Sequence, residues 1–225
     1  MRKFSCLLII ILTLPNIAQS QNSYNTVLKE IESLDTVFWF GLDFSNAKFV
    51  GPFPNRDDIK SSYLEAWNSY IINYNLLFYY KINPFVYDLS VIKKRNKAII
   101  EDDLFSMLDQ SLTKDSIQKI INEYNPLIKK GKGLVLIVEG FNKNLEQASI
   151  WFTYFDIQTR RIIYTEKILG IAKGTTMVNH WAQAIDDVIR HNNGTIPTER
   201  KPSSVFGFIL ALGLVIGIMI YGLSG

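Results

Sequence analysis

Cysteine and histidine are scarce in this chain of 225 residues, which has one cysteine and two histidines. Cys6 lies in an apolar stretch near the N-terminus, so a chain cleaved after that stretch has no thiol. This excludes disulfides, thiol catalysis and cysteine-ligated metals. His180 and His191 are expected on one helix, about 16 Å apart along its axis, which is too far to share a metal ion. The sequence therefore predicts no metal and no cofactor.

Familiar catalytic and nucleotide-binding motifs are also lacking. No G-x-S-x-G nucleophile elbow occurs, and Gly131 and Gly133 precede an apolar run, whereas a dinucleotide fingerprint follows one. An excess of one charge is lacking too, because the net charge of +3 includes Arg2 and Lys3. Without these two residues, 22 basic residues face 21 acidic ones. The balance argues against nucleic acid as a partner, and nothing in the motifs favours an enzyme.

The first 20 residues are typical of a secretory signal peptide. Arg2 and Lys3 form a basic start, and an apolar run covers residues 6–14. Ala18 and Ser20 are the small residues expected before a cleavage site, which predicts a mature chain beginning at Gln21. The apolar run is too short to span a bilayer, which takes about 20 residues. The alternative is a buried first helix or strand.

A second apolar segment, residues 205–223, runs for 19 residues without a charge. This length matches the hydrocarbon core of a bilayer and predicts a transmembrane helix in contact with lipid. Residues 192–204 form a polar tether before it. Gly213 and Gly217 have the small-x-x-x-small spacing of paired membrane helices, which predicts a homodimer through this helix. A buried soluble helix is the alternative, and glycine is common in membrane helices in any case.

The orientation of this single-pass chain rests on conflicting signals. A cleaved leader places the body in the periplasm or at the cell exterior. Arg200 and Lys201 then lie on the outer side, against the positive-inside tendency. A tail-anchored protein with a cytosolic body would remove this conflict but leaves the leader unexplained. A lipid-anchor signal with attachment at Asn193 and Gly194 is a third alternative. We favour the leader because its three parts occur in the right order.

Residues 21–191 between these segments are predicted to form one α/β domain, with α+β as the alternative. A nearly continuous apolar run at 37–44 indicates a buried strand, and residues 133–140 indicate another. Alternation predicts a further strand at 85–92 and a hairpin from 148–156 and 161–169. The result is a mixed sheet of about five strands. Helices are expected at 24–34, 58–80, 101–112, 115–124 and 179–191.

The candidate ligand-binding residues are Asp43, Lys173 and Thr175. Asp43 ends a predicted strand, and ligands of open α/β sheets bind at the carboxyl ends of strands. Residues 170–176 (GIAKGTT) link a strand to a helix, where backbone amides could hold a phosphate and Lys173 would add charge. A P-loop needs its lysine after the last glycine, so the order is wrong for that motif. A plain strand-to-helix loop is the alternative.

Four segments of the body resemble known envelope domains. They cover residues 37–44 (VFWFGLDF), 91–108 (VIKKRNKAIIEDDLFSML), 133–140 (GLVLIVEG) and 155–170 (FDIQTRRIIYTEKILG). Their order resembles the periplasmic α/β domains of the curli-secretion lipoproteins and of the lipoprotein activators of penicillin-binding proteins. The composition also resembles envelope proteins of Bacteroidetes-type bacteria. The chain departs from these families in having Arg160 where their hairpin carries glycine, in lacking a lipobox cysteine and in its C-terminal apolar segment.

Two hypotheses about function follow from the sequence. The resemblance implies binding and assembly without catalysis, so the first hypothesis is a membrane-anchored envelope module that binds a protein or a cell-wall component. The second is a small-ligand-binding or enzymatic domain with its site at the carboxyl edge of the sheet, using Asp43 and the Lys173 loop. Fold alone does not decide between them.

Overall fold

The computed structural model describes residues 36–80 and 85–191, together with Thr26 and Lys29. The predicted leader (1–20), tether (192–204) and apolar segment (205–223), with Gly213 and Gly217, lie outside the described residues. Within the described part of the chain, no helix combines the length and apolarity needed to cross a bilayer.

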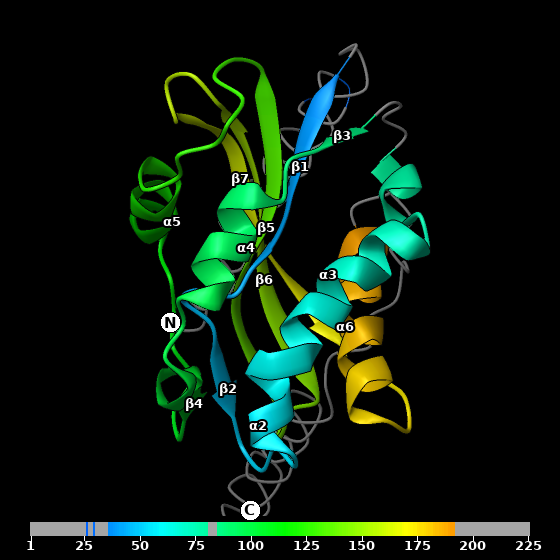
Figure 1. Cartoon of the computed structure of the whole chain (residues 1–225). Coiled ribbons are helices and arrows are strands. Elements are labelled where there is room, and N and C mark those ends of the chain that lie inside the picture. The colour runs from blue at the N-terminus through cyan, green and yellow to red at the C-terminus, as the bar shows by residue number, and fades with distance from the viewer. Residues whose placement is uncertain (1–25, 27–28, 30–35, 81–84, 192–225) are drawn as a thin grey trace, which may run out of the picture. The chain divides into compact units, whose positions relative to one another are not determined.

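The described residues form a mixed α/β fold around one sheet of seven strands (Figure 1). The strands are β1 (Val37–Asp43), β2 (Lys48–Val50), β3 (Phe85–Tyr87), β4 (Phe105–Ser106), β5 (Lys132–Asn142), β6 (Gln147–Asp156) and β7 (Ile162–Ile171). The main helices are α3 (Leu64–Asn73), α4 (Ser90–Lys97), α5 (Lys114–Asn122) and α6 (Met177–His191), and the single turn α2 (Arg56–Asp58) leads through a π-helical turn into α3. The predicted α/β class is confirmed.

Strand β5 is the centre of the sheet because it is long and almost wholly buried. On one side it pairs antiparallel with β6, which pairs antiparallel with β7. On the other side β1 runs parallel along its first half and β2 along its end, with Asp43 opposite Ile137 and Val50 opposite Asn142. β3 and β4 extend the sheet beyond β1 and β2.

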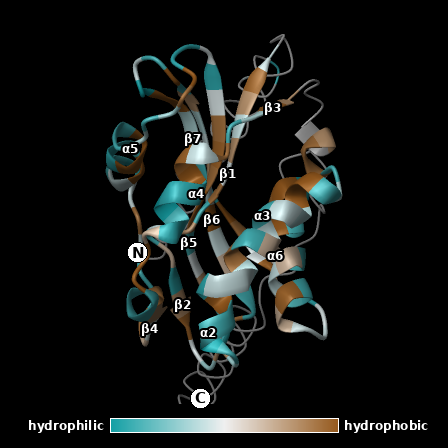
Figure 2. Ribbon diagram, in the orientation of Figure 1, coloured by the Kyte–Doolittle hydropathy of each residue, from teal (hydrophilic) through white to brown (hydrophobic). Residues whose placement is uncertain are grey.

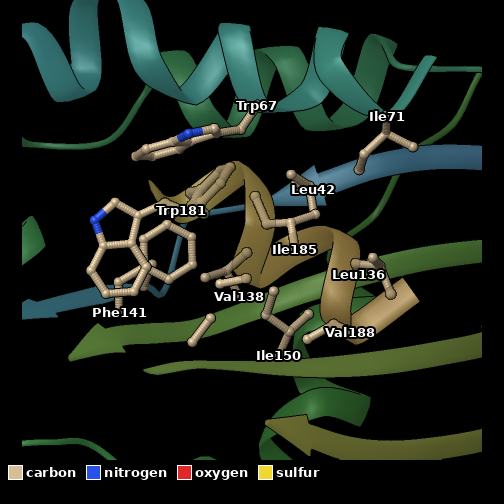
Figure 3. Packing of buried hydrophobic residues seen from close by; sticks show 14 of the residues in the cluster. Leu42, Trp67, Ile71, Leu136, Val138, Phe141, Ile150, Trp181, Ile185 and Val188 are labelled. Carbon is tan, nitrogen blue, oxygen red and sulfur yellow. The ribbon is translucent and has the colours of Figure 1, made fainter. Parts of the chain in front are cut away.

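Helices cover both faces of the sheet (Figure 2), and buried apolar side chains of helices and strands form one cluster on each face. On one face α3 and α6 pack on the strands, and the rings of Phe141 and Trp181 stack at 4.5 Å between centroids (Figure 3). Trp67 meets Phe141 at 5.2 Å. On the other face α4 and α5 contribute Ile92 and Ile117 to a smaller cluster. Both clusters bury apolar surface, the main favourable contribution to folding.

Two predicted elements are wrong, and both errors have a local cause. The strand expected at 85–92 stops at Tyr87, because the Asp88 carboxylate accepts a hydrogen bond from the Ser90 amide and starts α4. The helix expected at 101–112 is a short 3₁₀ helix, Glu101–Leu104, followed by β4 and an extended segment. The Leu112 amide of that segment donates to the Glu139 carboxylate, at 2.5 Å. This tertiary contact overrides the helical pattern.

The β6–β7 hairpin has the predicted turn, and the backbone conformation at Arg160 shows why glycine is the residue expected there. The Asp156 carboxylate accepts hydrogen bonds from the Thr159 amide and hydroxyl, both at 2.9 Å. With Lys132 also beside it, the pKa of Asp156 falls to about 2. Arg160 then takes φ of 57°, in the left-handed region that favours glycine. The turn therefore holds an arginine in a glycine conformation.

We expect the Arg160→Gly variant to raise the free energy of unfolding by about 0.5–1 kcal/mol, because glycine adopts a positive φ without steric cost. Urea unfolding followed by tryptophan fluorescence measures this, since Trp39, Trp67, Trp151 and Trp181 are all buried. Arg160→Ala is the matched control, because it removes the side chain and keeps the Cβ. An equal gain from alanine would contradict the conformational explanation.

Candidate functional site

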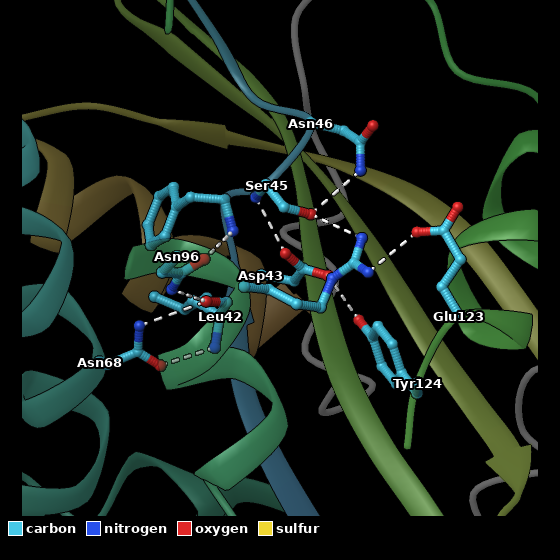
Figure 4. Close-up of polar contacts among 10 residues, drawn as sticks. Leu42, Asp43, Ser45, Asn46, Asn68, Asn96, Glu123 and Tyr124 are labelled. Carbon is cyan, nitrogen blue, oxygen red and sulfur yellow. Dashed lines mark hydrogen bonds and ion pairs between the residues drawn. The ribbon is translucent and has the colours of Figure 1, made fainter. Parts of the chain in front are cut away.

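Asp43 lies at the end of β1 with its side chain fully buried. Its Oδ2 accepts hydrogen bonds from Arg95 Nε at 3.0 Å and from the Tyr124 hydroxyl at 2.7 Å. Its Oδ1 accepts one from the Ser45 amide at 2.9 Å (Figure 4). Both oxygens are thus engaged by groups of the domain itself. The geometry assigns Asp43 a role in the interior, and its predicted role as a ligand contact stays a prediction.

Arg95 connects the buried Asp43 carboxylate to residues nearer the protein surface. It extends from α4, and its guanidinium also donates to Ser45 Oγ at 2.8 Å and to Glu123 at 2.9 Å. Burial tends to lower the pKa of Arg95, but the Asp43 carboxylate together with Glu123 and Tyr124 outweighs burial, so the pKa is raised. Burial and the same carboxylate raise the pKa of Tyr124 well above its ordinary value. Tyr124 therefore remains a hydrogen-bond donor to Asp43 over the physiological pH range.

Two asparagine side chains form hydrogen bonds with the backbone at the outer edge of β1, beyond the point where β3 ends. Asn68 of α3 accepts a hydrogen bond from the Leu42 amide at 2.7 Å and donates to the Leu42 carbonyl at 3.2 Å. Asn96 of α4 donates to the same carbonyl at 2.9 Å and accepts from the Phe44 amide at 2.9 Å. Their carboxamides replace the peptide groups of a neighbouring strand and satisfy this buried backbone.

Gly41 permits this close approach of α3 to the strand. Its φ is 108°, and a Cβ at this position would lie 2.6 Å from Asn68 Oδ1. The pairing of β1 with β5 also shifts between Trp39 and Gly41, as in a β-bulge. The bulge and the missing side chain together let the asparagine reach the Leu42 peptide groups.

A groove of about 660 Å³ lies above these asparagines, between α3 with the turn before it and α4. Apolar atoms of Leu64, Leu89 and Ile92 line it together with Asn68 and Asn96. Charged residues of both signs also line it: Lys60, Glu65, Lys93, Lys97 and Glu101. Lys93 and Glu65 form an exposed ion pair at 3.6 Å between the two helices. We call this cavity the α3–α4 groove.

A smaller and more polar pocket, of about 220 Å³, surrounds Glu139 on β5. The Glu139 side chain is 4% exposed, and its carboxylate accepts hydrogen bonds from Ser149 Oγ at 2.5 Å and Lys167 Nζ at 3.2 Å. Gln110 also donates from its side chain to the Glu139 carbonyl at 2.7 Å. The Leu112 amide also donates to this carboxylate, so the Glu139 side chain links β5 to β6, to β7 and to the segment before α5.

The structure does not bring Asp43 and the predicted loop together. β7 ends at Ile171, opposite Gln147, whose own partner in β5 is Asn142. Asp43 lies opposite Ile137, five residues earlier in β5 and on the other side of that strand. Lys173 and Thr175 are exposed beyond the end of β7 and line neither cavity.

Metal-binding clusters of three His, Cys, Asp or Glu side chains are not found among the described residues. The residues that sequence reasoning missed are Asn68, Asn96, Arg95 and Tyr124. A signal existed for the first, because Asn68 is a polar residue beside the buried stripe of a helix. The others depend on chain segments meeting across more than 50 residues.

No family model matches the chain, and no curated protein matches it either. Among solved structures, the chain is similar to the C-terminal domain of LpoB from Salmonella enterica. The alignment covers 68% of this chain and 95% of that domain, at 12% sequence identity and a TM-score of 0.29. The likeness is one of distant fold only. The resemblance to curli-secretion lipoproteins is tested by none of these comparisons and stays a prediction.

We expect Asp43→Ala to lower the free energy of unfolding by about 3 kcal/mol, because it leaves Arg95 and Tyr124 without their buried acceptor. Arg95→Met should cost a similar amount, since it strands the buried carboxylate. Urea unfolding of both single variants and the double variant gives a double-mutant cycle. The double variant should be less destabilised than the sum of the two. Strict additivity would show that the two side chains are not coupled.

Proposed function

We propose that the chain is a membrane-anchored, extracytoplasmic binding module of the cell envelope, acting on a protein or cell-wall partner without catalysis. In this proposal residues 1–20 are a leader, residues 21–191 the binding domain, residues 192–204 a tether and residues 205–223 the lipid-embedded anchor. Pairing through Gly213 and Gly217 would make the anchored chain a dimer. The sequence features of the two ends support this placement, and the α3–α4 groove supports the binding role.

The α3–α4 groove is the observation that carries the proposal. Its volume of about 660 Å³ lies within the usual range for ligand sites, about 300–1,000 Å³. Leu64, Leu89 and Ile92 can receive apolar groups of a partner, while the surrounding lysines and glutamates can pair with charges of either sign. This combination of an apolar centre and a charged surround is typical of protein–protein recognition.

The asparagines restrict how a partner can bind there. A partner strand could extend the sheet only by pairing with free peptide groups at the edge of β1. Asn68 and Asn96 already occupy the Leu42 and Phe44 groups at this edge. The groove therefore favours insertion of partner side chains between the two helices over addition of a strand.

The alternative of a small-ligand site finds better support at Glu139 than at Asp43 or Lys173. The pocket of about 220 Å³ there holds lysine, carboxylate, amide and hydroxyl groups within one cavity. A polar molecule of amino-acid size fits that chemistry and volume. Asp43 offers no comparable space, because Arg95, Tyr124 and Ser45 fill its surroundings.

Site-specific photocrosslinking in cells of the chain's own source tests the binding role. A photoreactive residue at Ser61 or Lys97, both lining the groove, should give a discrete adduct that is absent at Gln158 in the exposed hairpin turn. The Leu89→Arg substitution fills the groove and should reduce the adduct at least fivefold. Leu108→Arg, at a leucine that is 78% exposed elsewhere, is the matched control. Identical adduct patterns at Ser61 and Gln158 would contradict a groove-bound partner.

The location is tested separately, by mass spectrometry of the N-terminus and protease treatment of cells. We expect a mature chain that begins at Gln21 and is digested only after the outer barrier has been opened. These results follow from a cleaved leader and a body outside the cytoplasmic membrane. An intact Met1 with a body protected in spheroplasts would indicate the tail-anchored, cytosolic alternative instead.

A further inference from the structure

Large apolar side chains are exposed together at one end of the domain. Tyr74, at the end of α3, and Phe78, in the 3₁₀ helix Leu76–Tyr80, are each 69% exposed. Tyr87 of β3 is 46% exposed, on the same face of the strand as Phe85, which packs against the α3 and α6 cluster. Asn75, with a left-handed φ of 51°, separates Tyr74 from the 3₁₀ helix that carries Phe78, and the 3₁₀ helix and β3 lie at the same end of the domain (Figure 1). We call Tyr74, Phe78 and Tyr87 the aromatic patch.

The described chain leaves the domain beside this patch. Trp67 Nε1 of α3 donates to the Val178 carbonyl of α6, and Gln183 of α6 contacts the Tyr70 hydroxyl. The contacts advance in the same direction along both helices, so α3 and α6 run parallel. α6 also contacts the 3₁₀ helix. Its last residue, His191, therefore lies toward the end of the domain that carries the aromatic patch.

The segment that follows α6 is short, and its length limits which surfaces this end of the domain can contact. Only 13 residues, 192–204, separate His191 from the apolar segment 205–223. Fully extended, they span about 45 Å. A domain held this close to a bilayer meets it at high effective concentration, so that even a weak contact is populated.

We propose that the aromatic patch docks on the lipid bilayer at the headgroup–acyl boundary. The chemistry fits this occupant, because tyrosine rings place an apolar body in lipid and a hydroxyl in water, and they are enriched at membrane interfaces. Phe78 supplies apolar surface that can enter between lipids, while an exposed patch in water remains unfavourable. This inference rests on the proposed membrane anchor.

The consequence for binding is an oriented domain. α3 forms one wall of the α3–α4 groove and ends at Tyr74 of the patch. Contact with lipid at that end of α3 would fix how the groove faces the space above the membrane. A partner would then meet the groove in a restricted set of directions, which lowers the entropy lost on binding.

Depth-dependent fluorescence quenching tests the contact in the full chain. In a Cys6→Ser background the chain has no other cysteine, so Phe78→Cys gives one labelling site for the dye NBD. The matched control is Leu145→Cys, at a leucine that is 64% exposed after the far end of β5. Both chains are reconstituted in nanodiscs of phosphatidylethanolamine and phosphatidylglycerol, with a quencher-labelled lipid. We expect quenching at position 78 to be at least twofold stronger than at position 145.

The possible outcomes separate this proposal from the proposed function. Carbonate extraction of native membranes is measured in parallel, and release of the chain would overturn the anchor and the lipid contact together. Retention with equal quenching at the two positions would overturn the lipid contact alone. A blue-shifted dye at position 78 that lipid does not quench would mean that protein covers the patch, either residues 22–35 or a partner, and would also overturn lipid docking.

Discussion

The arrangement of the domain depends on one buried carboxylate. Asp43 ends β1 where the chain turns toward β2. Its charge is balanced by an arginine from α4, and a tyrosine that follows α5 donates a hydrogen bond to it. A carboxylate without a partner is very costly in an interior, so these three segments must meet for the domain to fold. The ion pair thus places α4 and the end of α5 on the same face of the sheet, and it fixes the turn at Ser45. A buried ion pair need not add net stability, but its geometry specifies which segments meet.

The point along β1 at which β3 ends decides where a cavity forms beside the sheet. β3 pairs with only the first residues of β1, and the chain then turns into α4. The strand edge left behind cannot stay unsatisfied, and two asparagines on flanking helices take over its hydrogen bonds. Because side chains replace a strand, the two helices stand apart above them. The α3–α4 groove is a consequence of ending β3 early.

The strands and helices with a strong pattern could be predicted from the sequence. The apolar runs of β1 and β5, the alternation of β6 and β7 and the apolar face of α6 all appear where expected. β2 and β4 were not expected, because three and two residues are too few for alternation to be visible. The aromatic residues at helical spacing in 63–77 predict a face that packs on the sheet. Trp67 confirms this, while Tyr74, which follows the last residue of α3, is largely exposed.

The candidate site was largely beyond sequence reasoning. Asp43 was singled out as a strand-end residue, but its partners lie 52 and 81 residues away, and no local pattern joins them. Lys173 and Thr175 were chosen for their place between a strand and a helix. That placement is correct, and the register of β7 nevertheless puts them far from Asp43. The predicted chain ends fall outside the described residues and stay predictions.

The pairing of β1 with β5 has a consequence for the time at which the domain can fold. Phe38 lies opposite Gly133, so β1 can pair with β5 only after a segment 95 residues later in the chain has been synthesised. The β5–β6–β7 meander, by contrast, has short connections and can form as soon as its own residues are available. A nascent chain therefore holds an apolar strand that lacks its central partner until more than half of the chain has been made, and before that it can pair with no more than the three residues of β3. Until β5 has been made, β1 is an apolar segment without most of its sheet, to which a chaperone can bind.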